Sequence, residues 1–384
     1  MIELYHQKSQ CTGCQSCANA CPSGAITMVA DREGFLYPTI DGNRCTECGL
    51  CQKVCHKEIK KQENPQAYGA YCKDLNLRLK SSSGGLFSVF ADKILQMNGV
   101  VVGAAMADDF KSVEHRFADN QEELKKLRGS KYVQSNIGTS YSQVEQLLKQ
   151  GKIVYFSGTP CQIEGLYRYL RKDYENLYTQ DLICHGAPSP LAWRKYAQEQ
   201  EISRKAPIRE VSFRNKSYGW KRFAMRIDFD AEIPHHCEEL AEDPYLRGFM
   251  SDNFLRPSCY ACQYKTKLRS ADITLADFWG AGEICPELDD DKGLSLVIVH
   301  SPKGKALLES VQEKIVRKSV DLDEAVRYNP AMIRSSGAGK NRAGFMKDLP
   351  DSSYQKLFKK YVEVPNWVRF KSRIKGIVKK AIRR

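Results

Sequence analysis

Long apolar runs are missing from this chain of 384 residues. The longest candidates, Gly99–Met106 and Gly293–Val299, fall well short of the roughly 18 residues that a membrane-spanning helix needs, so both are expected to be buried strands. The first residues include Glu3 and no apolar block follows them, unlike a signal peptide. We therefore expect a cytoplasmic protein whose thiols are kept reduced.

Two further patterns are missing. No Gly-x-Gly-x-x-Gly follows an apolar run, so nothing predicts a Rossmann dinucleotide site. The net charge is +13, but eight of the Lys and Arg residues, and no Asp or Glu, lie in residues 364–384. No basic stripe interleaved with aromatic residues occurs elsewhere. Nucleic acid is therefore not expected as a partner.

Cysteine, by contrast, is abundant. The chain has 15 cysteines, and eight of them fall within Cys11–Cys55. In a reducing compartment this density predicts bound metal rather than disulfides.

The eight clustered cysteines form two runs with the same spacing, Cys11-x2-Cys14-x2-Cys17-x3-Cys21 and Cys45-x2-Cys48-x2-Cys51-x3-Cys55. This is the spacing of bacterial ferredoxins that hold two [4Fe-4S] clusters. Pro22 follows the first run as expected, whereas His56 stands in the corresponding place after the second.

The spacing also predicts which cysteines share a cluster. The fourth cysteine of each run ligates the other cluster in such proteins. One cluster should take Cys11, Cys14, Cys17 and Cys55, and the other Cys45, Cys48, Cys51 and Cys21. Structural zinc is the alternative, but zinc sites pair two short cysteine hooks across a longer gap.

The rest of the chain indicates an α/β fold. Residues 1–62 form the cysteine-rich part, and the polar segment Lys57–Pro65 resembles a linker. From residue 66 onward, buried-strand runs alternate with amphipathic helical stretches, for example Ile153–Phe156 after residues 141–150. This alternation predicts a mixed α/β domain around a mostly parallel central sheet.

Two polar loops are candidates for binding an anion. Ser81-Ser82-Ser83-Gly84-Gly85 precedes the helical stretch Leu86–Met97, and Gly129-Ser130-Lys131-Tyr132 offers a fixed cation. Small residues before a helix let backbone N–H groups approach a phosphate. Taken alone, such a loop can equally be a simple turn.

Four cysteines outside the ferredoxin-like part are candidates for a further site. Thr159, Pro160 and Gln162 predict a helix start with a capping box, which places Cys161 in the first turn, where the helix dipole favours its thiolate. Such a thiolate is either a nucleophile or a metal ligand. Cys184 ends another predicted strand, and Cys259-x2-Cys262 lies further on, so the four could meet at one sheet edge. The alternative is ordinary buried thiols.

The remaining cysteines, Cys72, Cys237 and Cys285, are expected to be buried or without a role. His235-His236-Cys237 could hold a metal, but the flanking Pro234 and acidic residues favour an exposed loop.

Together, these segments resemble the beta subunit family of coenzyme F420-reducing hydrogenase and dehydrogenase. The matching stretches are Ser81–Gly85, Gly129–Tyr132, Gly158–Gln162, Cys184–Gly186, Arg256–Cys262 and Ala271–Gly280. The resemblance implies an FAD site and a third [4Fe-4S] cluster beside it, and Ala276 stands where the family usually has glycine. It also implies that proteins of this kind occur in bacteria without F420, often associated with surface-polysaccharide synthesis.

From this resemblance we expect two further groups of site residues. The third cluster would take Cys161, Cys184, Cys259 and Cys262. The flavin site would be formed by Ser82, Ser83, Gly84, Gly85, Ser130, Lys131, Tyr132, Gly158, Thr159 and Asp277, with Lys131 near the pyrophosphate.

The expected activity is that of an iron–sulfur flavin-dependent oxidoreductase. Clusters carry single electrons, whereas a flavin exchanges both single electrons and hydride, so it can connect the clusters to a substrate or small hydride carrier. No catalytic acid or base is predicted. The alternative is an electron-transfer or docking subunit that serves a redox partner protein and has no substrate of its own.

The C-terminal part has its own pattern. We expect residues 66–345 to form the family-like domain and residues 346–384 a basic tail. Trp367, Phe370, Ile374 and Ile377 recur at helical spacing with cations between them, as in helices that lie on anionic membranes. Attachment to the inner membrane face, packing on the protein or a partner, and disorder are the three alternatives.

Overall fold

The computed structural model describes residues 2–56 and 58–363, and three β-sheets organise these residues. The first contains β1 (Ile26–Ala30) and β2 (Leu36–Ile40). The largest contains, in spatial order, β13 (Ile315–Val320), β3 (Gln66–Cys72), β12 (Ser295–Val299), β11 (Ile273–Asp277), β7 (Leu177–Leu182), β6 (Val154–Ser157), β4 (Val100–Met106) and β5 (Val113–Ala118). The third contains β10 (His236–Glu239), β9 (Ala224–Phe229) and β8 (Ile208–Asn215).

Helices connect and cover these sheets. The α-helices are α1 (Ser16–Ala20), α2 (Leu50–His56), α3 (Leu75–Leu79), α4 (Leu86–Gln96), α5 (Gln121–Leu127), α6 (Ser140–Lys149), α7 (Pro160–Leu170), α8 (Pro190–Arg204), α9 (Pro244–Met250), α10 (Ala281–Ile284), α11 (Pro302–Glu309), α12 (Leu322–Arg327), α13 (Arg342–Asp348) and α14 (Tyr354–Tyr361). The 3-10 helices are η1 (Lys8–Gln10), η2 (Pro257–Ala261), η3 (Pro286–Leu288), η4 (Gln312–Lys314) and η5 (Pro330–Met332). The α/β class is confirmed, as are the expected helices near Leu86–Met97 and residues 141–150.

The pairing in the large sheet differs from the expectation of a mostly parallel sheet. The central strands β4, β6, β7 and β11 pair in parallel. The flanking pairs β4 with β5, β11 with β12, and β3 with β12 and β13 are antiparallel. The short connection between β4 and β5 explains one case, because a crossover to a parallel strand needs a dozen or more residues.

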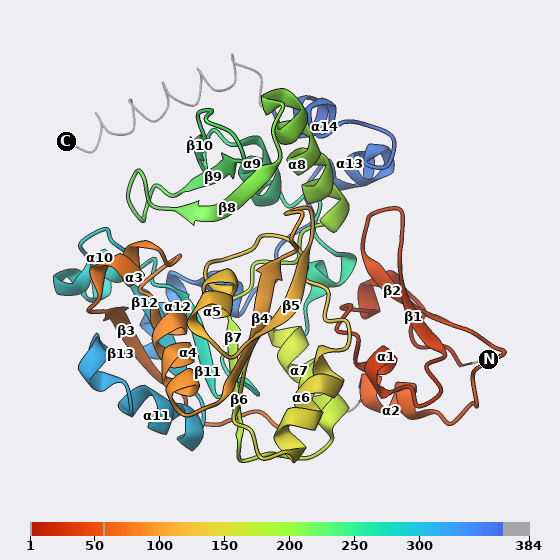
Figure 1. Cartoon of the computed structure of the whole chain (residues 1–384), viewed down its shortest axis with the longest axis horizontal. Helices are drawn as coiled ribbons and strands as arrows, with labels where there is room; N and C mark the ends of the chain where they lie inside the picture. The colour runs from red at the N-terminus through yellow and green to blue at the C-terminus, as the bar shows by residue number, and fades with distance from the viewer. Residues whose placement is uncertain (1, 57, 364–384) are drawn as a thin grey trace.

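The central strands β4 and β6 are nearly continuous apolar runs because both faces of the sheet are covered. Val101 and Tyr155 face the core made with α4, α5 and α11. Their neighbours Val102 and Phe156 face a second core made with α6 and α7. Alternate residues of one strand thus fill two cores, which produces a helix–sheet–helix arrangement (Figure 1).

A third core lies beneath β8, β9 and β10 and is built mainly from aromatic side chains around Trp193 of α8. Helix α14 contributes Tyr354, Leu357 and Phe358 to it. The sequence placed the start of the basic tail at residue 346, but α14 is therefore part of the packed body. The rest of the predicted tail, residues 364–384, lies outside the described residues.

The ferredoxin-like part lies beside the body, next to α6 and α7 (Figure 1). Ser16 Oγ of α1 donates a hydrogen bond to the carbonyl oxygen of Gly165 in α7, at 2.6 Å. Asn19 donates to the carbonyl oxygen of Gly138, at 2.8 Å, just before α6. The expected linker is also attached, because Lys61 forms an ion pair with Glu164 and Gln62 N donates to the carbonyl oxygen of Arg269.

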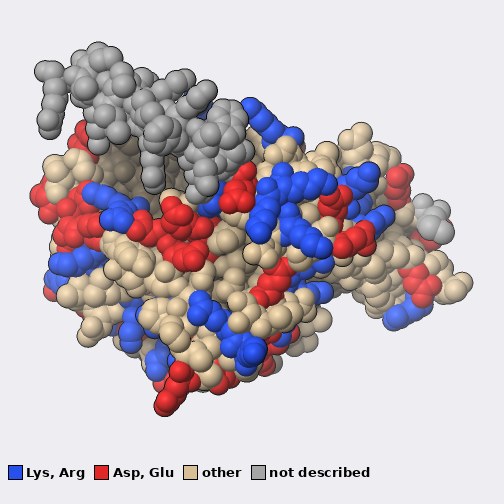
Figure 2. Space-filling model, turned by 90° about the horizontal axis from the view of Figure 1, so that it is seen from above, with Lys and Arg blue, Asp and Glu red and all other residues tan. Residues whose placement is uncertain are grey.

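Both signs of charge occur on the face shown in Figure 2. Opposite charges form ion pairs on and beside β9 and β10, including Arg226 with Asp228 and Arg222 with Glu239. Within the described residues, no helix is long and apolar enough to span a membrane.

The contact at Gly165 allows a prediction about how the two parts are held together. A Cβ atom there would lie 2.9 Å from Cys14 Cβ and 2.8 Å from Tyr141 Oη, which is too close for normal packing. Gly165→Ala should therefore weaken the contact between α1 and α7, at about 1–3 kcal/mol, even though alanine is the better helix former.

Limited proteolysis with trypsin at Lys60 and Lys61 measures this effect, because cleavage there needs the linker to leave the body. Gly337→Ala is the matched control, since a Cβ at that exposed glycine would meet nothing within 4 Å. Equal cleavage rates for the two variants would contradict the prediction.

Candidate iron–sulfur sites and the adjoining loops

Twelve of the cysteines are brought together in three sets of four, and all 15 cysteines are free of disulfides. The first set is Cys11, Cys14, Cys17 and Cys55. The second set is Cys21, Cys45, Cys48 and Cys51. The third set is Cys161, Cys184, Cys259 and Cys262.

The first set joins the two cysteine runs. Cys17 interacts electrostatically with Cys14, Cys11 and Cys55, and Cys55 interacts with Cys14 and Cys11. Burial raises the pKa of Cys17 well above its usual value, and repulsion from these neighbouring thiolates adds to the increase. The fourth cysteine of the second run thus lies with the first three of the first run.

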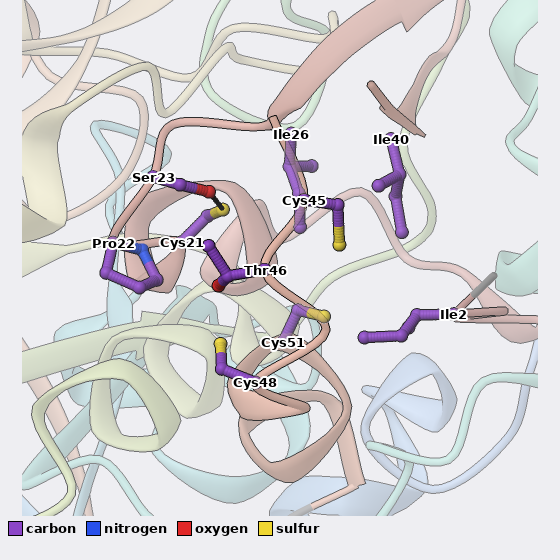
Figure 3. Close-up of a pocket in the computed structure, with 10 residues that line it drawn as sticks. All are labelled: Ile2, Cys21, Pro22, Ser23, Ile26, Ile40, Cys45, Thr46, Cys48 and Cys51. Carbon is purple, nitrogen blue, oxygen red and sulfur yellow. Dashed lines mark hydrogen bonds between the residues drawn. The ribbon is translucent and has the colours of Figure 1, made fainter. Parts of the chain in front are cut away.

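The second set lines one pocket at the outer end of the ferredoxin-like part, together with Ile2, Ile26 and Ile40 (Figure 3). The backbone N–H of Ala25 and the hydroxyl of Ser23 lie 3.3 and 3.6 Å from Cys21 Sγ. Cys48 is exposed, unlike every other cysteine of the three sets. This set is therefore the one nearest to solvent.

The third set is assembled at the carboxyl ends of two neighbouring parallel strands. Cys161 follows β6 at the start of α7, and Cys184 follows β7. The segment with Cys259 and Cys262 is held beside them, because Arg256 N donates to the carbonyl oxygen of Ala187 and Ala187 N lies 3.3 Å from Cys259 Sγ. Cys184 interacts electrostatically with both Cys259 and Cys262.

The predicted start of α7 is confirmed, but its expected effect on Cys161 is not. Thr159 N donates to the side-chain oxygen of Gln162 at 2.9 Å, which closes the capping box, and Pro160 is the first helical residue. The helix dipole was expected to favour the thiolate. Instead, desolvation of this partly buried thiol raises the pKa of Cys161 above its usual value, against the hydrogen bond with Thr159 Oγ1.

The same environment surrounds the other members of the third set. Burial raises the pKa values of Cys184 and Cys259 to about 12. Protonated, buried thiols are poor nucleophiles, whereas a bound metal can deprotonate them. Of the two roles that the sequence left open, the environment favours metal ligation.

The separation of the sulfur atoms bears on the type of metal site. Among the described residues, no three cysteine sulfurs lie within 4.8 Å of one another. A tetrahedral zinc ion with Zn–S distances of about 2.3 Å would hold its sulfurs roughly 3.8 Å apart. The three sets therefore suit a larger multinuclear group better than a single zinc ion.

Helix α7 connects the first set to the third. Cys161 lies in its first turn, and Gly165, four residues later on the same face, packs against Cys14. Cys14 and Cys161 interact electrostatically. Since Cys55 also interacts with Cys51, the sets follow one another in the order second, first, third.

The two loops predicted to bind a cofactor also lie together. Ser130 N donates to Ser82 Oγ at 2.8 Å, which joins them directly. Ser83 Oγ donates to the carbonyl oxygen of Leu294, and Gly84 N donates to Ser295 Oγ. Gly84 has to be glycine, because a Cβ would lie 2.4 Å from the carbonyl oxygen of Ala70.

Lys131 does not point its charge at this junction. Its Nζ donates to the carbonyl oxygens of Lys126, Leu127 and Arg128, at 2.9–3.0 Å, so it caps the end of α5. Burial lowers the pKa of Lys131 to about 7. All three N–H donors are used, and the expected contact with a pyrophosphate is not supported by this geometry.

Other predicted cofactor residues belong to two different surroundings. Gly158 and Thr159 lie beside the third set, because Thr159 Oγ1 is 3.1 Å from Cys161 Sγ. Asp277 is instead paired with Arg214, through two hydrogen bonds of 2.6 and 2.9 Å. Tyr132 Oη accepts a third hydrogen bond from Arg214, at 3.2 Å.

Sequence reasoning missed several residues around Asp277. Trp220 Nε1 donates to Asp277, and the Trp220 ring stacks on the half-exposed Trp279 with centroids 5.3 Å apart. Lys216 Nζ donates to the carbonyl oxygens of Arg78 and Ser83 at the first loop and interacts electrostatically with Asp277. No local sequence motif predicts the role of Arg214, because its partner Asp277 lies 63 residues away in the sequence.

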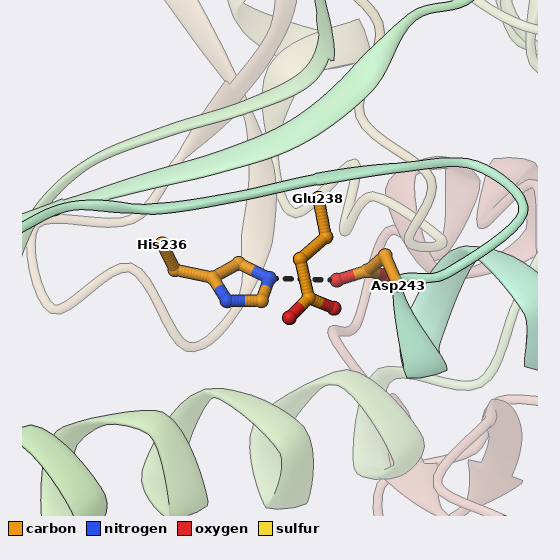
Figure 4. Close-up of side chains that lie close together, drawn as sticks. All are labelled: His236, Glu238 and Asp243. Atoms are coloured by element: carbon orange, nitrogen blue, oxygen red, sulfur yellow. Dashed lines mark hydrogen bonds and ion pairs between the residues drawn. The ribbon is translucent and has the colours of Figure 1, made fainter.

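His236 was expected in an exposed loop, but it is buried in strand β10. Its Nε2 lies 2.9 Å from Asp243 Oδ2, which also accepts a hydrogen bond from Tyr196 Oη at 2.7 Å (Figure 4). Asp243 Oδ1 accepts from Leu246 N and caps α9. Both carboxylate oxygens of Asp243 therefore have hydrogen-bond partners within the protein, which indicates a structural role for this residue. Cys72 and Cys285 are buried, as expected.

Comparison with known proteins assigns most of the chain to recognised families. Residues 10–59 match the model of a 4Fe-4S dicluster domain. Residues 67–140 match the model described as coenzyme F420 hydrogenase/dehydrogenase, beta subunit N-term, and residues 151–325 match the corresponding C terminus.

Individual relatives are more distant. The chain is 28% identical over 194 residues to the coenzyme F420-dependent sulfite reductase of Methanocaldococcus jannaschii, a match that spans 48% of this chain but only 29% of that protein. A ferredoxin-like protein in the nif region of Rhizobium leguminosarum bv. trifolii is 42% identical over 53 residues, 12% of this chain and 75% of that protein.

A solved structure also aligns with the chain. It comes from the F420-reducing [NiFe] hydrogenase complex of Methanosarcina barkeri and has 16% sequence identity and a TM-score of 0.47. The alignment covers 78% of this chain and 91% of that one. The two beta subunit models match residues 67–140 and 151–325, after the dicluster domain at residues 10–59. These matches show that the chain belongs to the coenzyme F420 hydrogenase/dehydrogenase beta subunit family.

Proposed function

We propose that this protein is an iron–sulfur oxidoreductase that passes single electrons along three [4Fe-4S] clusters held by the three cysteine sets. The main support for this proposal is the position of α7. This helix has Cys161 in its first turn and packs Gly165 against Cys14. A [4Fe-4S] cluster supplies one-electron chemistry when it is bound. The residues fit such clusters because each set offers four thiols spaced too widely for one zinc ion.

The protein's own contribution would be to orient the thiols and to exclude water. Partial burial of Cys161, Cys184 and Cys259 would limit the access of water to the third set. Ala187 N–H is positioned toward Cys259 Sγ, and hydrogen bonds to sulfur are one means by which proteins adjust a cluster's potential. The second set, in which Cys48 is exposed, is suited to exchange electrons with a redox partner protein.

We propose that FAD binds where the two polar loops meet. A flavin connects one-electron carriers to two-electron substrates. Gly85 is the N-cap residue of α4 and supplies no side-chain cap, so the first N–H groups of that helix remain available to a phosphate. Arg128 is the suitable cation, because its Nε donates to Ser88 Oγ in the first turn of α4.

The two-electron side of the reaction would lie near Tyr132 and Asp277, which Arg214 joins. Half-exposed Trp279 stacks on Trp220 beside this pair and offers an aromatic surface to a substrate or small hydride carrier. The names of the relatives make a deazaflavin carrier one candidate. A link to surface-polysaccharide synthesis rests on the family resemblance alone.

The second candidate function is an electron-transfer or docking subunit without its own substrate. The exposure of Cys48 favours it, because a protein partner can reach the second set directly. The two functions differ in one property, since only the oxidoreductase requires bound flavin.

We further propose that residues 364–384 attach the protein to an anionic membrane surface at the cytoplasmic side. These residues lie outside the described part of the chain, so the argument rests on their sequence. In the sequence, eight cations are interspersed with apolar residues at helical spacing, Trp367 among them. Each cation near an anionic leaflet contributes about 1 kcal/mol.

The number of clusters can be tested by iron analysis after anaerobic reconstitution. Three clusters correspond to about twelve irons per chain. Replacing both Cys259 and Cys262 by alanine should remove about one third of the iron, because the third set would lose two ligands. Cys237→Ala is the matched control and should keep all of it. About eight irons in the wild type and in the double variant would rule out the third cluster.

The flavin site can be tested by acid release and mass spectrometry of the cofactor, with affinity measured by titration. Arg128→Gln should weaken FAD binding about tenfold or more, since a charge-assisted contact contributes about 1.5–3 kcal/mol. The exposed Lys80, beside the same loop, provides the control Lys80→Gln. Fully iron-loaded protein that releases no flavin would defeat the proposal and favour the docking subunit.

Membrane attachment can be tested by sedimentation with vesicles of anionic or neutral lipid. The full chain should sediment with anionic vesicles at low salt and be released at high salt, because the attraction is screened. A chain ending at Val364 should stay in solution. Equal binding by both chains, or binding by neither, would exclude the tail as an anchor.

A further inference from the structure

Arg256 is a buried cation whose charge is not balanced by a carboxylate. Its side chain is among the largest fully buried ones in the protein, and the residue is 1% exposed. Among the residues that the structure describes, no Asp or Glu forms an ion pair with it. An isolated buried charge is expensive, so a source of negative charge has to lie nearby.

The guanidinium group enters the ferredoxin-like part next to the first cysteine set. Nε donates to the carbonyl oxygen of Cys11 at 2.8 Å, and Nη2 donates to the carbonyl oxygen of Leu36 at 3.0 Å. Nη2 also lies 3.6 Å from Cys11 Sγ. Gln134 Oε1 accepts from Nη1 at 3.0 Å. The carbonyl oxygens of Cys11 and Leu36 and the amide oxygen of Gln134 are neutral acceptors. Of the groups that these contacts involve, only the Cys11 thiol can carry a negative charge.

The loop between Cys11 and Cys14 is shaped around this cation. Gly13 has a φ of +70°, and a Cβ there would lie 2.7 Å from Arg256 Nη1. Glycine therefore serves both the backbone conformation and the approach of the guanidinium. On the other side, the ring of Tyr37 lies 4.2 Å from the guanidinium carbon.

Arg256 also belongs to the segment that carries the third set. It precedes η2, and its carbonyl oxygen accepts a hydrogen bond from Cys259 N at 2.9 Å. The backbone of Arg256 is thus bonded to Cys259 of the third set, while its guanidinium group lies 3.6 Å from Cys11 Sγ of the first set. One cationic residue therefore contacts two of the three sets.

We propose that Arg256 is a positioning residue whose fixed charge raises the reduction potentials of the clusters in the first and third sets together. The inference rests on the proposed cluster ligands. A cluster becomes more negative when it accepts an electron, so a nearby cation stabilises its reduced form. The second set, at the outer end of the domain, has no contact with Arg256 and should keep its own potential.

The test is a redox titration of the full, reconstituted chain, followed by electron paramagnetic resonance. Arg256→Gln should decrease the equilibrium constant for one-electron reduction of the first and third clusters about tenfold, which is a decrease of about 59 mV in each potential. The second cluster is the reference within the same molecule. Arg256→Lys should largely restore both potentials, because it keeps the charge.

Arg342→Gln is the control for a merely structural role. Arg342 also joins the ferredoxin-like part to the body, through Glu33 at 2.7 Å, but it contacts no cysteine. It should leave all potentials unchanged. Equal potentials in wild type and Arg256→Gln, or the same shift in Arg342→Gln, would overturn the inference.

Two further outcomes are informative. If the glutamine variant does not load iron, the lysine variant decides: wild-type potentials in it support the charge effect, and low potentials contradict it. Absence of clusters from the wild type would instead defeat the proposed function, so the two failures can be told apart.

Discussion

The close contact between α7 and the ferredoxin-like part is the constraint on which the rest of the structure depends. A glycine at position 165 lets Cys14 and the hydroxyl of Ser16 approach the helix backbone. The same helix begins with Cys161, whose position is set by the capping box of Thr159 and Gln162. One rigid element therefore fixes the distance between two cysteine sets from different parts of the chain.

This arrangement gives the three sets different surroundings. The third set lies at the carboxyl edge of the central parallel strands, where loops from β6 and β7 converge. The first set is covered on one side by α7 and on another by Arg256. The second set is left at the outer end with Cys48 exposed. In the proposed electron path, exchange with a partner at the second set would thus be separated from the third set at the other end.

Features encoded in short segments could be predicted from the sequence. The two cysteine runs, the start of α7 at Pro160 and the strands near Val100 and Val154 depend on residues a few positions apart. Spacing, capping and apolar runs are sufficient for these because the interactions involved are local. The crossed grouping, with Cys55 near Cys14 and Cys11, also followed from the known behaviour of this spacing.

Features that depend on contacts between distant segments could not be predicted. The pairing of Arg214 with Asp277 and the contact of Arg256 with Cys11 join residues far apart in sequence. The sequence predicted Lys131 as a phosphate ligand because its actual partners are backbone carbonyl oxygens at the end of α5, and no residue type identifies such an acceptor. The aromatic core that retains α14 is likewise formed only when α8 and α9 are in place.

The central claim is that the first and third sets hold neighbouring clusters in one chain. Electron paramagnetic resonance of the fully reduced protein at low temperature tests it most directly, because unpaired spins on adjacent clusters interact. The account predicts that the spectrum loses the coupling between the first and third clusters when Cys259 and Cys262 are both replaced by alanine, whereas the coupling between the first and second clusters remains. A signal from the first cluster that is identical with and without the third would contradict the account.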